Sequence, residues 1–247
     1  MMLDFTQFQW SLAIVGATFI GMTKTGLPGG GILIVPLMAL MLPARESTGF
    51  VLPMLAMADI IAILYWRRHV NWRQLGRLLP WTWAGVIAGA QGMEHITNDQ
   101  LKPMIGVLVL VLTAGSWLRE RLVSDESIPK HWLFAALIGI LAGSTSMLAN
   151  AAGPIMIIYL VAMRFQKREF IGTQAWFFWI LNLSKIPFSQ GQGLITMQSF
   201  LTNLSLLPCI IVGAAMGILL ANRLPEAVFA LIVRLLALVA AIGLCVH

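Results

Sequence analysis

The feature that most constrains this chain is a series of apolar stretches separated by short loops that hold most of the charge. Six of the stretches have seventeen or more residues, and they lie at 48–66, 76–92, 101–118, 171–189, 199–221 and 226–246. A helix needs about 20 apolar residues to cross a bilayer. Only 11% of the residues are charged, against about a quarter in soluble domains. The sequence therefore predicts an all-α polytopic membrane protein.

Four shorter apolar stretches come in two pairs, 8–22 with 32–42 and 132–146 with 154–163. A polar, glycine-rich break separates the members of each pair. Each pair is either one broken helix that crosses the membrane or a re-entrant hairpin that returns to its starting side. As a helix, an arm of fifteen residues reaches only about 22 Å, which is short of a full crossing and favours hairpins.

The positions of the basic residues decide between these alternatives. Thirteen of the sixteen Lys and Arg residues lie in loops. With hairpins, eleven of the thirteen fall on one side and only Arg45 and Lys102 on the other, whereas crossing pairs divide them seven to six. Cytoplasmic loops carry the excess of Lys and Arg. We therefore expect six full crossings and two hairpins, with both termini outside the cytoplasm. The formal charge of +6 is an orientation signal, and we expect no nucleic-acid partner.

The two halves of the chain align with each other in order. The aligned pairs are Gly21 with Gly143 and Gly31 with Gly153 at a shift of 122, Asp59 with Asn182 at 123, and Gly85 with Gly213 and Gly89 with Gly217 at 128. We predict a first membrane repeat at 1–118, a cytoplasmic connecting loop at 119–131 and a second membrane repeat at 132–247. Each repeat is a broken-helix hairpin plus three transmembrane helices, so the second enters the membrane inverted. Inverted repeats with broken helices are a transporter architecture.

The hairpin tips form a candidate anion site. Lys24 lies at the first tip, and the second arm is expected to begin near Gly31, where unpaired helix N–H groups favour an anion. The second hairpin repeats this arrangement at Gly153. The alternative is a glycine-rich kink from which Lys24 extends to water.

Four ionisable residues lie within the predicted membrane segments: Lys24, Asp59, Lys185 and Arg234. Such residues are costly in lipid and are functional candidates. Asp59 is a candidate proton-coupling carboxylate, and the alternative is a structural ion pair with Lys24 or Arg234. Gln174, Phe178, Asn182 and Lys185 follow one helical face.

Small polar residues at the breaks are candidates for contacts with an oxyanion, although each also suits the capping of exposed backbone. The predicted substrate-binding residues are Lys24, Thr25, Gly29, Gly30, Gly31, Thr145, Ser146, Asn150, Gly153, Gln174, Asn182 and Lys185. We find no HExxH motif, serine–histidine pairing or redox cysteine pair, so we expect no enzyme activity, no cofactor and no metal. Trp66 and five further tryptophans are expected in interfacial belts.

Several of these motifs resemble the sulfite exporter TauE/SafE family. The string 21–26 (GMTKTG), the cluster Gly29–Gly31 and the run through Asp59 to 66–68 (WRR) resemble its first half. The second half is similar at 143–146 (GSTS), at 153–154 and from 170 through Asn182 to 185–187 (KIP). The resemblance covers nearly the whole chain. Ala151 and Ala152 depart from it where more glycine is expected, and Asn150 stands where relatives often have His.

The resemblance implies a secondary transporter that exports small sulfur-containing anions such as sulfite, thiosulfate, sulfoacetate or related organosulfonates, coupled to protons. It also implies roles for the glycine cluster, Lys24, Asp59, Asn182 and Lys185. A passive anion channel, or an uptake permease for a different small anion, is the alternative. We expect a multi-pass protein of the bacterial inner membrane, with the lipid bilayer, protons and the anion as partners. The sequence does not indicate an oligomeric state.

Overall fold

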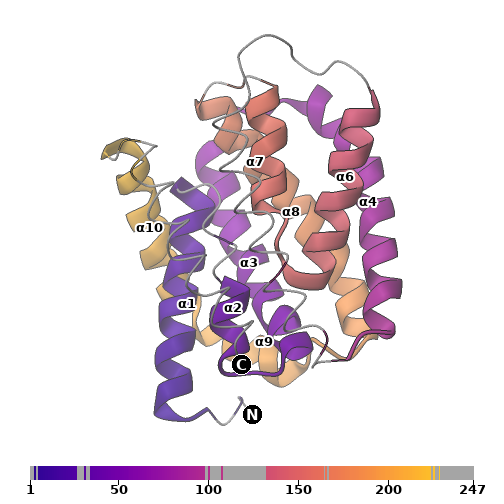
Figure 1. Ribbon diagram of the computed structural model, residues 1–247. Coiled ribbons are helices and arrows are strands. Elements are labelled where there is room, and N and C mark those ends of the chain that lie inside the picture. The colour runs from indigo at the N-terminus through magenta and orange to yellow at the C-terminus, as the bar shows by residue number, and fades with distance from the viewer. Residues whose placement is uncertain are drawn as a thin grey trace.

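The computed structural model of the chain describes residues 5–26, 34–97, 132–163 and 167–223 (Figure 1). It also describes seven single residues: Leu3, Gly31, Gln100, Val107, Phe165, Pro225 and Val228. All the regular structure in this part of the chain is helical. Apart from Val107 and Val228, the predicted crossings at 101–118 and 226–246 and the connecting loop 119–131 lie outside the described residues.

Nine helices make up this part of the fold. In the first half they are α1 (Gln7–Gly26), α2 (Ile34–Ala39), α3 (Ala44–Trp66) and α4 (Trp72–Glu94). In the second half they are α6 (Trp132–Ala149), α7 (Gly153–Ala162), α8 (Lys167–Gly191), α9 (Met197–Ser205) and α10 (Leu207–Arg223). In both halves the broken pair is followed by a helix of more than twenty residues, α3 with 23 and α8 with 25.

Among the described residues, two helices are each long and apolar enough to cross a bilayer, residues 45–66 of α3 and the whole of α6. Helices α9 and α10 pass the same test only when they are taken together as one span. This pair is bent by 50°, where the sequence predicted one continuous helix. The bend lies beside Pro208, which lacks an N–H and disfavours helical geometry in the preceding residue.

The first arms of the two hairpins are longer than expected. α1 has 20 residues and α6 has 18, so each reaches about 27–30 Å. The argument from short arms was therefore wrong for α1 and α6, because both helices continue into the polar residues of the break. The second arms are short, with 6 residues in α2 and 10 in α7.

The path of the chain shows that each pair folds back on itself. In the first pair, the Gln9 side chain near the start of α1 donates to the Met41 carbonyl just beyond α2, at 3.1 Å. In the second pair, Phe134 near the start of α6 stacks on Tyr159 near the end of α7, with ring centroids 5.9 Å apart. The first hairpin begins at the end of the molecule near the N-terminus, and the second begins at the opposite end (Figure 1).

Among the described helices, the most extensive contacts are those of α1 with α10 and of α4 with α6. Both pairs are close-packed at glycines, where a Cβ atom would overlap a backbone carbonyl of the facing helix. The glycine–carbonyl contacts are Gly21 with Ile210, Gly143 with Thr82, Gly213 with Thr18 and Gly85 with Ile140. Each contact in one helix pair maps onto a contact in the other when α1 and α6 are related by 122 residues and α4 and α10 by 128.

Helices α3 and α8 lie side by side between these two pairs. One apolar cluster surrounds α1, α2 and α3, and another joins α4, α6, α7 and α8. Polar side chains from α1, α3, α6 and α8 lie in the interior between the two clusters, and they form the candidate site.

Candidate functional site

The carboxylate of Asp59 on α3 is the centre of the first polar group. Its Oδ1 lies 2.8 Å from Nζ of Lys24 on α1, and its Oδ2 accepts a hydrogen bond of 2.6 Å from the side-chain amide of Asn182 on α8. Asp59 has no solvent exposure. The ion pair of Asp59 with Lys24 is one of the alternatives that the sequence left open, and Arg234 lies outside the described residues.

Lys24 does not extend to water, because its side chain is only 9% exposed. Its ammonium group also lies 4.1 Å from the centre of the Phe178 ring, a cation–π contact. Phe178 is one turn before Asn182 on the same face of α8, so this face holds Lys24 and Asp59 together. The alternative in which Lys24 snorkels from a kink is not what the structure shows.

Lys185, one turn beyond Asn182, is the second buried cation. It is 1% exposed and donates to the Ser146 carbonyl at 3.1 Å, the Ser146 hydroxyl at 2.8 Å and the Asn150 side-chain oxygen at 2.5 Å. These three acceptors are neutral. Ser146 and Asn150 belong to the tip of the second hairpin, so Lys185 connects α8 to this tip.

Asn150 connects the second tip to α3 as well. Its backbone has a φ of +49°, a left-handed conformation that asparagine tolerates better than most residues. Its amide nitrogen donates to the Thr48 carbonyl at 3.0 Å, while its amide oxygen accepts from Lys185. A single side chain therefore joins α3, the tip and the buried ammonium.

Counted by residue type, the described side chains of the two groups include two lysines, Lys24 and Lys185, and one carboxylate, Asp59. Lys24 and Asp59 are close enough to interact electrostatically with Lys185. Within the described residues, the two ammonium groups face one carboxylate, and that carboxylate is already paired with Lys24. A buried charge without a counter-ion is unfavourable, so this arrangement suits the binding of a small anion near Lys185.

Other predicted site residues have different partners. The Thr25 hydroxyl donates to the backbone carbonyls of Gly21 and Ala214. The Thr145 hydroxyl donates to the backbone carbonyl of Leu141. In this conformation they stabilise the backbone. Gln174, another predicted substrate-binding residue, is 9% exposed. Its side-chain oxygen is a buried acceptor with no hydrogen-bond partner among the described residues.

The helix N-termini at the two tips differ. α7 begins at Gly153 as predicted, whereas the described part of α2 begins at Ile34, three residues after Gly31. Gly31 lies in a short 3₁₀ turn, and Gly29 and Gly30 lie outside the described residues. We predicted that the N-termini of the two second arms converge. The structure describes the N-terminus of α7, whereas the residues just before α2 lie outside the described part of the chain.

Trp66 is a site residue that the sequence reasoning placed wrongly. We expected it in an interfacial belt, but it is buried and its indole N–H donates to the Thr25 carbonyl at 2.9 Å. It holds the end of α1 against the end of α3. A tryptophan next to two arginines, as in 66–68 (WRR), is typical of a membrane interface. The hydrogen bond of Trp66 to Thr25 could not be predicted, since it depends on how far α1 extends.

Residues 13–244 of the chain match the sulfite exporter TauE/SafE family. The chain belongs to this family. The match covers nearly the whole sequence and includes every site residue described above. Comparison with curated proteins and with solved structures found no match. The protein is thus an integral membrane protein of a transporter family.

Proposed function

We propose that this TauE/SafE protein is a secondary transporter that exports small sulfur-containing anions such as sulfite, thiosulfate, sulfoacetate or related organosulfonates. The observation that carries the proposal is the burial of two lysines, Lys24 and Lys185, with a single carboxylate, Asp59, among the described residues. A compact oxyanion supplies the missing counter-charge and several acceptors for the donors that surround it.

Lys185 is the principal anion-binding group in this proposal. Lys24 is already neutralised by Asp59 at 2.8 Å, whereas Lys185 has only neutral acceptors. Oxygen atoms of an anion replace some of these acceptors as charge-assisted partners, which are stronger than neutral ones. Gln174 and Asn182 lie on the same face of α8 and define the rest of the site.

Transport proceeds by alternating access between two inverted repeats. The repeated glycine contacts, which match the same sequence shifts in both helix pairs, support the repeat. The two hairpins begin at opposite ends of the molecule and both tips supply residues to the polar interior. Rocking of one repeat against the other exposes such a central site to each side in turn.

Asp59 couples transport to protons. Its carboxylate and the substrate anion are both counter-charges for the buried lysines, because Asp59 pairs with Lys24 and also acts electrostatically on Lys185. Protonation of Asp59 weakens its ion pair with Lys24 and changes the net charge next to Lys185 and its anion, and loss of the proton restores the pair.

The proposal is tested by anion binding and flux in two variants that differ in net charge. Lys185→Met removes the uncompensated charge, whereas the double variant Lys24→Met with Asp59→Asn removes one charge of each sign. We expect Lys185→Met to lower sulfite binding at least tenfold, while the double variant retains binding within about threefold. Binding is measured from the thermal stabilisation of purified protein by sulfite.

Flux of radiolabelled sulfite and a C2 sulfonate in inside-out vesicles completes the test. Accumulation against a concentration gradient, driven by a proton gradient, supports a secondary transporter. Flux that only equalises the two sides favours the passive channel. Unchanged binding in Lys185→Met contradicts the proposed role of the buried charge.

A further inference from the structure

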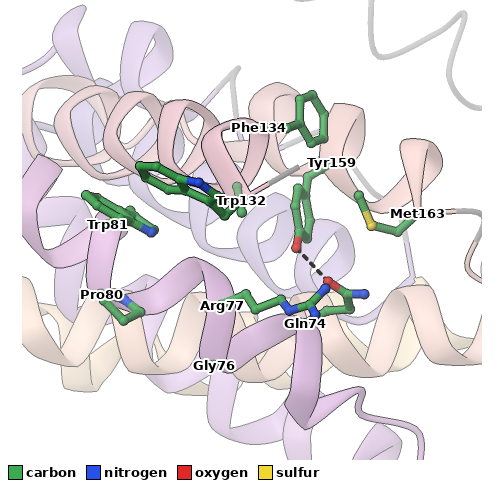
Figure 2. Close-up of a pocket in the computed structure, with 10 residues that line it drawn as sticks. Gln74, Gly76, Arg77, Pro80, Trp81, Trp132, Phe134, Tyr159 and Met163 are labelled. Carbon is green, nitrogen blue, oxygen red and sulfur yellow. Dashed lines mark hydrogen bonds between the residues drawn. The ribbon is translucent and has the colours of Figure 1, made fainter. Parts of the chain in front are cut away.

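A cleft of about 600 Å³ lies between α4, α6 and α7, away from the buried lysines (Figure 2). Its polar end is formed by Gln74 and Arg77 on α4 and by Tyr159 on α7. These residues lie near the start of α4 and the end of α7. The cleft therefore lies at the end of the molecule where the connection 67–71 holds Arg67 and Arg68 and the first two turns of α4 hold Arg73 and Arg77.

The polar end of the cleft presents donors. The Tyr159 hydroxyl donates to the side-chain oxygen of Gln74 at 2.9 Å (Figure 2), and this bond leaves the amide nitrogen of Gln74 as a donor in the same cleft lining as Arg77. Arg77 is exposed, and among the described residues that line the cleft none is acidic. Guanidinium and amide N–H groups in this arrangement match the oxygens of a phosphate group.

The walls of the cleft are apolar and mostly aromatic. Trp81 and Trp132 stack with ring centroids 5.7 Å apart, and Phe134 and Met163 complete the wall (Figure 2). Beyond it, Leu133, Leu137 and Leu141 of α6 are exposed on the surface of a helix long enough to span a bilayer. An apolar chain that leaves the cleft therefore stays in contact with the lipid-facing surface.

We propose that this cleft binds the phosphate headgroup of an anionic phospholipid, with the first part of an acyl chain against Trp81 and Trp132. Basic clefts between membrane helices at headgroup level recognise anionic lipids, and tryptophans are enriched at the same depth. The inference is independent of the transported substrate.

The test is native mass spectrometry of the full-length protein in detergent, titrated with phosphatidylglycerol or phosphatidylcholine. Wild type is expected to bind one phosphatidylglycerol more tightly than any phosphatidylcholine. Arg77→Gln is expected to weaken that binding about fivefold, whereas Arg73→Gln, one turn earlier and outside the lining, leaves it unchanged. Equal losses in the two variants would indicate general surface charge and overturn the proposal.

A second measurement keeps the fold intact and locates the acyl chain. Phosphatidylglycerol brominated on its acyl chains is expected to quench tryptophan fluorescence, with a smaller quenched fraction in Trp132→Phe. An unchanged quenched fraction in Trp132→Phe overturns the placement of the acyl chain against Trp132. Competition by soluble glycerol phosphate as strong as that by the lipid would show a free phosphate site and also overturn the lipid assignment.

Discussion

At the scale of single residues, the site is governed by how three buried charges are shared. One carboxylate oxygen of Asp59 is paired with the Lys24 ammonium and the other accepts from the Asn182 amide. Both oxygens of Asp59 therefore have a partner in this conformation. Lys185 depends on one hydroxyl, one carbonyl and one amide oxygen. The two buried lysines therefore differ in their partners more than in their burial.

Removal of Lys24 should destabilise the protein, because it leaves the Asp59 carboxylate buried without its cation. Breaking one partner of a buried ion pair costs about 3–5 kcal/mol. We expect Lys24→Met to lower the melting temperature in detergent well below that of wild type. Adding Asp59→Asn to this variant should recover most of the loss, and equal melting temperatures for the single and double variants would contradict the ion pair.

Asp59→Asn alone should remove the pH dependence of transport. Asparagine keeps the shape of the side chain and can still interact with Asn182, but it neither binds nor releases a proton. We expect flux of a C2 sulfonate, whose sulfonate group stays ionised over this range, to become independent of pH between pH 5.5 and 8, whereas wild-type flux responds to an imposed pH gradient. A variant with a wild-type pH profile would show that Asp59 is structural.

At the scale of helices, the close approach of α1 to α10 and of α4 to α6 positions both hairpins. At Gly21 and Gly143 the facing carbonyl occupies the space that a side chain would need. These contacts lie within two turns of the tip residues Lys24 and Ser146. The distance between helices is therefore coupled to the placement of the site.

Gly143→Ala should destabilise the protein and displace the second tip. A Cβ at this position overlaps the Thr82 carbonyl, and overpacking of this kind costs about 1–3 kcal/mol. We expect a lower melting temperature in detergent and weaker sulfite binding. Gly92→Ala in α4 is the matched control, because nothing lies within 4 Å of its Cβ position, and alanine there should be neutral or slightly stabilising. Similar losses in the two variants would contradict the packing argument.

At the scale of the whole molecule, the two hairpins begin at opposite ends, and basic residues concentrate at the end where α6 begins and α7 ends. The positive-inside rule predicts that this end faces the cytoplasm. The tips then extend far into the bundle from both sides, and each one supplies a residue to the buried charges. Orientation and site location are thus consequences of one arrangement.

Cysteine labelling tests this orientation. In a variant without Cys209 and Cys245, we expect Arg68→Cys to react with a membrane-impermeant maleimide only after the inner membrane is permeabilised. Gln198→Cys, at the start of α9, should react in intact spheroplasts. Both positions are exposed, so accessibility depends on the side of the membrane. The reverse pattern would overturn the orientation.

The sequence by itself determined the class of the protein, because apolar length and charge placement are properties of local segments. It also determined which side chains are candidates: Asp59, Asn182 and Lys185 can be aligned or placed on one helical face by spacing alone. The family match was likewise carried by local motifs.

Only the tertiary structure decided how those candidates are paired. Lys24 is neutralised by Asp59, while Lys185 is held by Ser146 and Asn150, and neither choice follows from spacing, because each joins helices far apart in the chain. The lengths of α1 and α6, the bend beside Pro208 and the burial of Trp66 also depend on packing against other helices. Local patterns report what a segment can form, whereas the partner of a buried charge is set by the geometry of the whole fold.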